Sequence, residues 1–311
     1  MKPILSILFL CSGLIAFSQE TFKYYDYQWK PCNAGSARFI SKVEKTDSGW
    51  LRNDYYAGSA VLQFRGLFAD SLLKKRHGDY AFFYPDGRCK ELGHYTNNKR
   101  SGLRMSWHYN GMLSDSSHYI NGDMVSSMGW HSNGYMSDSC FMNNGMLTVI
   151  EWFDNAVPAA AGRKLDGKKQ GKWQYFYKSG QLAASEKYEQ DKLTERIYYD
   201  TSGNIMADTT DRSRQAAFPG GVKGWQSFIL KRLYFPDQYK IVNSDIVTVV
   251  VSAIVDEDGK VSEPFVEIPF NPAFDKIALD IFRKTPKWIP AMDHNRQVKQ
   301  GIRQPVSFRQ E

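Results

Sequence analysis

A turn dipeptide recurs at a nearly constant interval along this chain, and this periodicity limits the fold more than any other sequence feature. The second residues of successive dipeptides are 24, 23, 22, 24 and 23 positions apart, and aromatic residues precede each turn. A fixed interval of this length indicates an array of repeated supersecondary units. The six dipeptides are Asp86-Gly87, Asn110-Gly111, Asn133-Gly134, Asn155-Ala156, Ser179-Gly180 and Ser202-Gly203.

Each period has the pattern of a β-hairpin. Asn-Gly and related pairs between aromatic runs form tight turns, because Asn and Gly tolerate the positive φ angles that these turns require. One hairpin cannot bury its own aromatic face, whereas stacked copies can, so we expect one elongated antiparallel sheet. A degenerate copy lies upstream at Tyr55-Tyr56-Ala57-Gly58. A second turn divides several periods in half, at Asn121-Gly122, Asn144-Gly145 and Asp166-Gly167.

The copy that begins at Lys169 reads KQGKWQYFYKSGQL and resembles the MORN repeat in its bacterial variant form. The same pattern recurs more loosely from Ser101 to Leu113, and the resemblance covers about residues 50–210. The resemblance implies a hairpin scaffold, since such repeats usually act as spacers or binding surfaces.

Aromatic residues and histidines both follow the repeat interval. Most of the rings recur at equivalent positions, which favours a role in the core of the array. A surface for glycan or peptidoglycan, tested best at Trp107 and Trp130, is the alternative. His108 and His131 are one period apart, but no carboxylate or cysteine accompanies them at metal-ligand spacing. No metal or cofactor is therefore predicted.

The first residues have the features of a secretory signal. Lys2 precedes an apolar run, Ile4 to Phe17, that is too short to span a bilayer, and small residues occupy the −3 and −1 positions before Gln19. We predict a signal peptide over residues 1–18 and an exported mature chain, with an uncleaved anchor as the alternative. Removal of the signal leaves three cysteines, which form at most one disulfide: Cys32, Cys89 and Cys140.

Charge and motifs exclude several classes of function. The formal net charge is +7, and the basic residues are scattered rather than gathered into one stripe, which argues against nucleic-acid binding. The sequence contains no nucleophile elbow, zinc-protease helix, phosphate loop or dinucleotide fingerprint. It therefore predicts a protein that is not an enzyme.

The periodicity stops near residue 212, which divides a repeat region over 19–212 from a C-terminal unit over 213–311. A β-branched run over 246–255 predicts a buried strand, and the turn at 256–259 leads to a return strand over 260–268. Apolar residues from Phe274 to Phe282 predict a helix. After a polar loop, residues 301–309 form a last strand. An earlier helix that ends before Pro236 is indicated by Trp225, Phe228, Ile229 and Leu233.

The expected fold class is therefore α+β: an array of β-hairpin repeats followed by one helical layer on a small antiparallel sheet. The C-terminal unit resembles the TonB C-terminal domain over about residues 214–309. The motifs that carry the resemblance occur in order, as Phe218-Pro219-Gly220-Gly221, Val255 to Val261, Phe274-Asp275, Lys287 to Ala291 and Pro305-Val306-Ser307-Phe308.

The resemblance also singles out four motif positions, Phe235, Pro236, Trp288 and Pro290. At the first of them the sequence departs from the family, which usually has Tyr-Pro where this chain has Phe235-Pro236. Any hydrogen bond from that hydroxyl is absent here.

The resemblance implies how a partner is bound. In this family the final strand pairs with an extended segment of an outer-membrane transporter, because an edge strand offers unpaired N–H and C=O groups. We therefore expect a location in the periplasm or at the periplasmic face of the outer membrane. The expected partner is a TonB-dependent transporter or another envelope protein. The expected edge-strand contacts are Gln300, Ile302, Gln304, Val306 and Phe308.

Two hypotheses about function follow. The chain has only 12 prolines, no Pro-rich spacer and no evident anchor besides the predicted signal, unlike an energy-transducing TonB. The first hypothesis is therefore an adaptor that docks by strand addition, with the array as its spacer, alone or within TonB-dependent transport. The second places function in the repeats, as a glycan- or peptidoglycan-binding scaffold, with the C-terminal unit as a homodimerisation domain.

Overall fold

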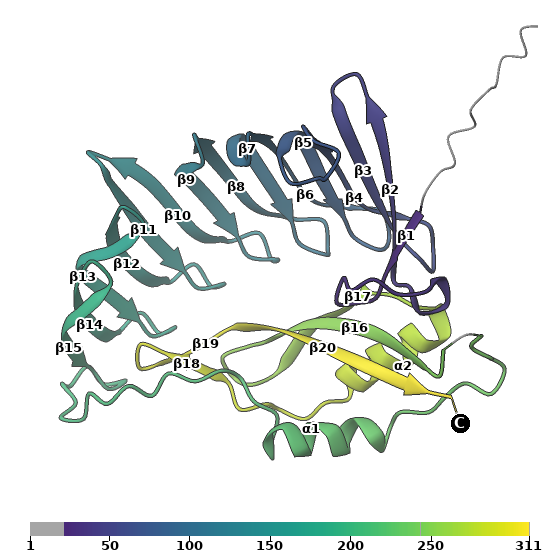
Figure 1. Cartoon of the computed structure of the whole chain (residues 1–311). Helices are drawn as coiled ribbons and strands as arrows, with labels where there is room; N and C mark the ends of the chain where they lie inside the picture. Colours follow the sequence, from purple (N-terminus) through teal and green to yellow (C-terminus); the bar gives the residue numbers. More distant parts are fainter. Residues whose placement is uncertain (1–21, 243, 311) are drawn as a thin grey trace, which may run out of the picture.

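The computed structural model describes residues 22–242 and 244–310 and is drawn in Figure 1. The signal peptide predicted over residues 1–18 lies outside these residues. Within them the chain is mostly β, with an antiparallel hairpin array followed by a small sheet that carries two α-helices. The predicted fold class is confirmed.

The array is one sheet of fifteen strands in the described part of the chain, and every strand pairs with its neighbours in sequence. Each hairpin thus pairs only with the hairpins before and after it, which is the arrangement that the periodicity predicts. A short 3-10 helix, η1 (Ala34–Ser36), separates the first two strands. The strands are β1 (Phe22–Tyr25), β2 (Phe39–Thr46), β3 (Gly49–Tyr56), β4 (Leu62–Phe68), β5 (Arg76–Phe83), β6 (Cys89–Thr96), β7 (Lys99–Trp107), β8 (Leu113–Ile120), β9 (Asp123–Trp130), β10 (Met136–Asn143), β11 (Met146–Trp152), β12 (Pro158–Leu165), β13 (Lys168–Phe176), β14 (Leu182–Glu189) and β15 (Lys192–Tyr198).

Two rows of turns border this sheet, and their geometries differ. In one row both central residues have positive φ, as at Asn121-Gly122 (54° and 98°), which suits a two-residue hairpin loop. In the other row only the second residue does, as at Gly111 (87°). In this second row Asn110 does not adopt the positive φ that the sequence predicted for it, and its side chain forms hydrogen bonds instead. Its Oδ1 accepts from the Met112 amide at 3.0 Å, and its Nδ2 donates to the Ser132 carbonyl, one period ahead, at 2.8 Å.

A ladder of side-chain hydrogen bonds joins successive periods. Tyr84 donates its hydroxyl to the Trp107 carbonyl at 2.7 Å, and His108 Nε2 lies 2.7 Å from the Trp130 carbonyl. Phe153 occupies the same position in its own period but has no donor. We call these equivalent residues, one in each period, the ladder positions: Tyr56, Tyr84, His108, His131, Phe153 and Tyr177.

The C-terminal unit is a three-stranded antiparallel sheet in the order β17–β16–β20, with helices against one face. Alternate side chains of the central strand, such as Val249 and Val251, are buried with Trp225 and Phe274 from the helices. The elements are α1 (Gly221–Leu230), β16 (Ile246–Val255), β17 (Val261–Ile268), α2 (Pro272–Arg283) and β20 (Gln300–Arg309).

Two expectations for this unit differ from the structure. The helix α1 ends at Leu230, and Leu233 packs against the core from the turn that follows. The stretch expected to be a polar loop contains a second hairpin, with β18 (Ala291–Asp293) paired to β19 (Arg296–Val298). Its two turn residues, His294 and Asn295, have φ of 48° and 63°, so this tight turn forms without glycine.

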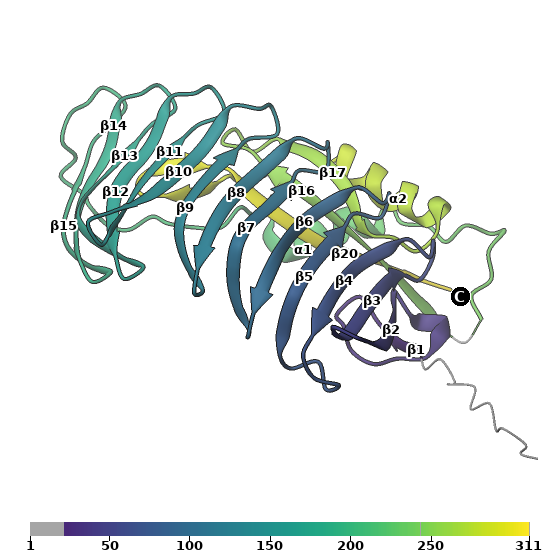
Figure 2. The same ribbon diagram turned by 90° about the horizontal axis from the view of Figure 1, so that it is seen from above.

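The array arches over the face of the C-terminal sheet that the helices leave open, as Figure 1 shows from the side and Figure 2 from above. At the first strands Arg38 Nε donates to the Thr248 carbonyl at 3.0 Å, and Val250 is buried against the array. Farther along, Tyr109 stacks on Phe265 with their ring centres 4.5 Å apart. The helices and the array thus cover opposite faces of the sheet, and β17 and β20 are its two edge strands among the described residues.

Candidate functional site

The last strand, β20, forms one edge of the C-terminal sheet. It pairs with β16 over its whole length, from Ile246 opposite Arg309 to Val255 opposite Gln300. Among the described residues no strand pairs with its other side. The five residues predicted to bind a partner therefore lie on an edge strand.

The backbone of β20 divides into an inner and an outer set of residues. Gln310 donates its amide to the Asp245 carbonyl at 2.9 Å, in the same register as the strand pair. Successive residues of a strand direct their N–H and C=O groups to opposite sides, so even-numbered residues face β16 and odd-numbered ones face away. Pro305 has no amide hydrogen, so it removes one donor from the outer side. The outer set is Gly301, Arg303, Pro305, Ser307 and Arg309.

The five predicted contact residues all belong to the inner set. Ile302, Val306 and Phe308 pack into the core beneath the helices. Gln300 accepts a hydrogen bond from the Ala216 amide, and Gln304 is half-buried. A strand added to this edge would hydrogen-bond to the residues between those predicted. Contact of the five with a partner stays a prediction.

A groove of about 840 Å³ runs beside the C-terminal half of this edge. Ser307 and Arg309 form one wall, and the segment after α1, which includes Tyr234 and Phe235, contributes to the other. The Phe235 ring packs edge-on against Phe274, with centres 5.2 Å apart. The first motif position and the outer side of β20 therefore border the same groove.

The other motif positions lie inside the fold. Pro236 is buried, and Pro290 is half-buried. Trp288 is 6% exposed, and its indole donates to Thr285 Oγ1 at 2.9 Å. Its ring contacts Phe218, which opens the family resemblance, in an edge-on arrangement. These three residues pack within the domain.

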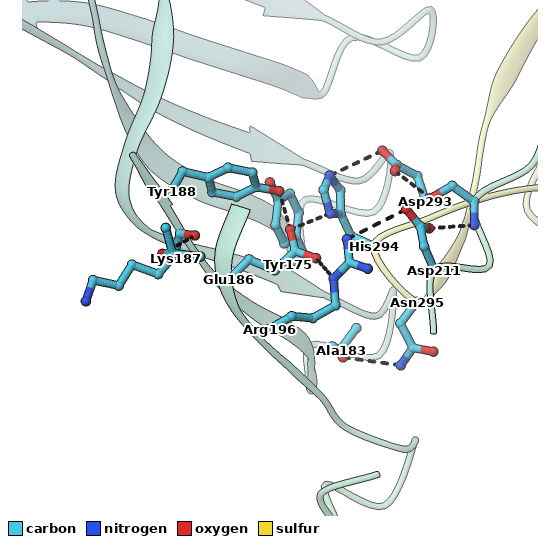
Figure 3. Close-up of polar contacts among 12 residues, drawn as sticks. Tyr175, Ala183, Glu186, Lys187, Tyr188, Arg196, Asp211, Asp293, His294 and Asn295 are labelled. Atoms are coloured by element: carbon cyan, nitrogen blue, oxygen red, sulfur yellow. Dashed lines mark hydrogen bonds and ion pairs between the residues drawn. The ribbon is translucent and has the colours of Figure 1, made fainter. Parts of the chain in front are cut away.

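A second constellation lies where the β18–β19 hairpin reaches the last strands of the array (Figure 3). The fully buried Glu186 side chain accepts from Arg196 Nε at 2.8 Å and from the Tyr188 hydroxyl, and it pairs with His294 Nδ1 at 2.8 Å. The His294 ring stacks on Tyr175, with centres 3.6 Å apart. Burial favours the neutral acid, but the hydrogen bonds and the nearby positive charge outweigh it and lower the pKa of Glu186.

The residues after His294 bind carbonyl groups of the array. Asn295 Nδ2 lies 3.0 Å from the Tyr199 carbonyl. Arg296 is 6% exposed and donates to the carbonyls of Ala159 and, at 2.9 Å, Phe176. We refer to His294, Asn295 and Arg296 as the hairpin clamp, because together they fix the C-terminal unit to the array.

An ion-pair cluster reinforces this attachment. Asp154 of the array lies 2.7 Å from Lys178 and 2.5 Å from Lys299 of the C-terminal unit. Burial favours the neutral acid here too, but hydrogen bonds and charge from the two lysines lower the pKa of Asp154 to about 2. The two units are thus joined at the beginning, the middle and the end of the array.

Other chemistry-bearing residues have structural partners. Cys32, Cys89 and Cys140 are free thiols, and Cys140 Sγ lies 2.8 Å from Ser127 Oγ. His108 and His131 bind backbone carbonyls in the ladder. Within residues 22–242 and 244–310, no helix is long and apolar enough to cross a bilayer.

The fold is thus a small α+β domain with an unpaired edge strand, preceded by an array of hairpins, in the described residues. Residues 246–310 of it match the sequence profile of the family described as Gram-negative bacterial TonB protein C-terminal. The match runs from β16 to β20 and includes α2, so the TonB-like character of this segment is confirmed. The MORN resemblance stays an interpretation of the repeat sequence.

No curated protein matches the chain. Among solved structures, the chain is similar to one described as "Crystal structure of accessory secretory protein 1,2 and 3 in Streptococcus pneumoniae". The two are 9% identical with a TM-score of 0.16, and the similarity covers 43% of this chain and 22% of that chain. A similarity this weak supports no conclusion about fold or function.

Proposed function

We propose that this chain is an exported, non-catalytic envelope protein that binds an extended segment of a partner along β20. The partner is an outer-membrane TonB-dependent transporter or another envelope protein with an accessible unstructured segment. The observation that carries the proposal is the unpaired outer side of β20 in the segment that matches the TonB C-terminal family. A periplasmic location agrees with that family and with the signal peptide predicted over residues 1–18.

The outer side of β20 supplies what strand addition needs. Gly301, Arg303, Ser307 and Arg309 each offer an amide to an incoming strand. Alternate side chains of that strand would meet the groove beside Ser307 and Arg309. Arg309 is exposed, and a partner segment with an acidic residue near it would gain an ion pair.

The array serves as a scaffold and spacer in this proposal. It covers the open face of the C-terminal sheet and is fixed there by the hairpin clamp. A partner therefore meets an edge rather than a face. Selectivity then depends on backbone pairing and on the groove residues, because the face itself is occupied.

The test is a calorimetric titration of the full chain with peptides from the periplasmic plug segments of TonB-dependent transporters. Ser307→Pro removes one outer amide and leaves the hydrogen bonds to β16 in place, so we expect it to weaken binding about tenfold. Ser307→Ala keeps the amide and loses only the contact of its hydroxyl with Thr248, so it is the matched control. Unchanged binding by a folded Ser307→Pro variant would exclude pairing along β20.

A further inference from the structure

A cleft of about 440 Å³ lies over strands β3 to β7, and no residue of β20 or of the hairpin clamp lines it. Ligand pockets of this size accommodate a small molecule of one or two rings. Its lining combines three guanidinium groups with aromatic rings, from Arg52, Arg76, Arg100, Phe64, Phe82 and Tyr95.

The two carboxylates of the cleft already have partners. Asp54 Oδ1 accepts from Arg52 Nε at 2.9 Å. Glu91 on β6 accepts a hydrogen bond from Arg104 Nη2 on the neighbouring strand β7 at 2.6 Å. Burial opposes ionisation of Glu91, but these hydrogen bonds and the arginine charges lower its pKa, so it is a carboxylate at neutral pH.

Two arginines of the cleft have no carboxylate within hydrogen-bonding distance among the described residues. Arg76 makes no ion pair among the described residues, and its Nη1 donates to the Tyr95 hydroxyl at 3.1 Å. Arg100 reaches Glu91 only at 3.8 Å, and its buried Nε has no hydrogen-bond partner in the described structure. Arginine suits carboxylates because its N–H groups match both oxygens. The cleft is therefore prepared for an anion.

The remaining walls suit a polyhydroxylated ring. Gln63 adds a polar side chain to the lining of the cleft. The rings of Phe64 and Phe82, with centres 4.7 Å apart, offer apolar faces. A sugar presents C–H groups to such faces and hydroxyls to polar groups around them.

The other end of the array shows what this position can accept. Phe82 and Tyr175 each lie two residues before a ladder position, Tyr84 and Tyr177. The Tyr175 ring is covered by the planar imidazole of His294, stacked at 3.6 Å. No segment of the C-terminal unit lines the cleft at Phe82. The ring at this position near the end of the array, Tyr175, is thus covered by His294. The equivalent ring near the beginning, Phe82, borders the cleft and is covered by no residue of the C-terminal unit that lines it.

We propose that this cleft binds an acidic saccharide of one or two sugar rings. Arg76 and Arg100 hold its carboxylate, and Phe64 and Phe82 contact the ring. This site is independent of strand addition at β20, and it gives the array a ligand of its own besides its role as a scaffold.

The experiment is calorimetric titration of the full chain with digalacturonate. Arg76→Gln and Arg100→Gln are each expected to weaken binding about tenfold, since each removes a charge-assisted hydrogen bond. Arg65→Gln is the matched control, because Arg65 is exposed on β4 and does not line the cleft. The neutral disaccharide N,N′-diacetylchitobiose is expected to bind about tenfold more weakly than digalacturonate.

Three results would overturn the proposal: no binding at millimolar digalacturonate, equal binding by both folded cleft variants, or displacement by equimolar sulfate. Thermal melts establish that the variants are folded, and Arg76→Gln is informative even if Arg100→Gln is not, since Arg76 is exposed. Peptide binding at β20 is expected to be the same in Arg76→Gln and in the parent. Failure of either proposal is thus visible without the other.

Discussion

Arg296 supplies the hydrogen-bond donor that Phe153 lacks. Its guanidinium carbon lies 5.4 Å from the centre of the Phe153 ring, and its Nη1 donates to the Phe176 carbonyl at 2.9 Å. At the five other ladder positions a tyrosine or histidine of the array binds the carbonyl one period ahead. The C-terminal unit therefore completes the hydrogen bonding of the array at one period.

This relationship predicts a compensating pair of substitutions. Arg296→Met removes the hydrogen bonds to the Ala159 and Phe176 carbonyls, so we expect it to reduce the free energy of unfolding by about 3 kcal/mol. Adding Phe153→Tyr is expected to restore about 1 kcal/mol, because the new hydroxyl can reach the Phe176 carbonyl. Urea unfolding of the two single variants and the double variant measures the coupling. Strictly additive effects would show that Arg296 does not act at the ladder.

The buried carboxylate of the clamp predicts a pH dependence of stability. The pKa of Glu186 is lowered in the folded chain, so its ionisation contributes stability that is present above its ordinary pKa of 4.5 and is lost as pH falls through the lower, folded value. Glu186→Gln is expected to cost about 3 kcal/mol at pH 7. The difference from the parent is expected to narrow at pH 3. Unfolding curves at the two pH values test this, and an equal difference at both would contradict it.

Asp275 predicts the opposite pH dependence. Burial raises its pKa to about 6 from 3.8, despite the hydrogen bond from the Phe270 amide at 2.9 Å. The folded chain therefore binds this proton more tightly, and the stability it contributes at low pH is lost as pH rises through 6. The loss amounts to about 3 kcal/mol. Asp275→Asn keeps an acceptor and cannot ionise, so we expect it to be more stable than the parent at pH 7.5 but not at pH 3. Thermal melts at both pH values decide the matter.

The missing amide at Pro305 predicts a gain of binding. Pro305→Ala adds an outer donor to β20, so we expect it to strengthen binding of a partner peptide about fivefold. The same change is expected to increase self-association, since prolines on edge strands oppose pairing between copies. Sedimentation velocity at several concentrations measures the second effect. Peptide affinity equal to that of the parent would indicate that the partner does not pair at this position.

Much of the fold was predictable because short-range sequence patterns determine its hairpins, its central strand and its second helix. The repeat interval sets the hairpins of the array, and the β-branched run over 246–255 coincides with β16. The helix α2 follows from its apolar face and from Asn271, whose side chain accepts from the Ala273 amide and so begins the helix.

The hairpin clamp and the cleft could not be predicted from local sequence patterns, because their residues come together only in the folded chain. The pair of Glu186 and His294 joins residues from different units, and neither has a distinctive sequence context. The only local signal of this hairpin was the polar pair His294-Asn295 a short distance after the apolar pair Ala291-Met292. The outer set of β20 also required the register, because sequence alternation alone does not say which amides face a neighbour.

The attachment of the C-terminal unit at both ends gives the array a defined length. One period contributes two strands, so it advances the sheet by about 10 Å. Deleting one whole period would preserve every remaining hairpin. It would also move either the contact of Arg38 with Thr248 or that of Asn295 with Tyr199 out of hydrogen-bonding range. Repeat arrays ordinarily gain or lose copies with little loss of stability. Here the C-terminal unit is attached near both ends of the array, so its length is compatible with only one number of repeats.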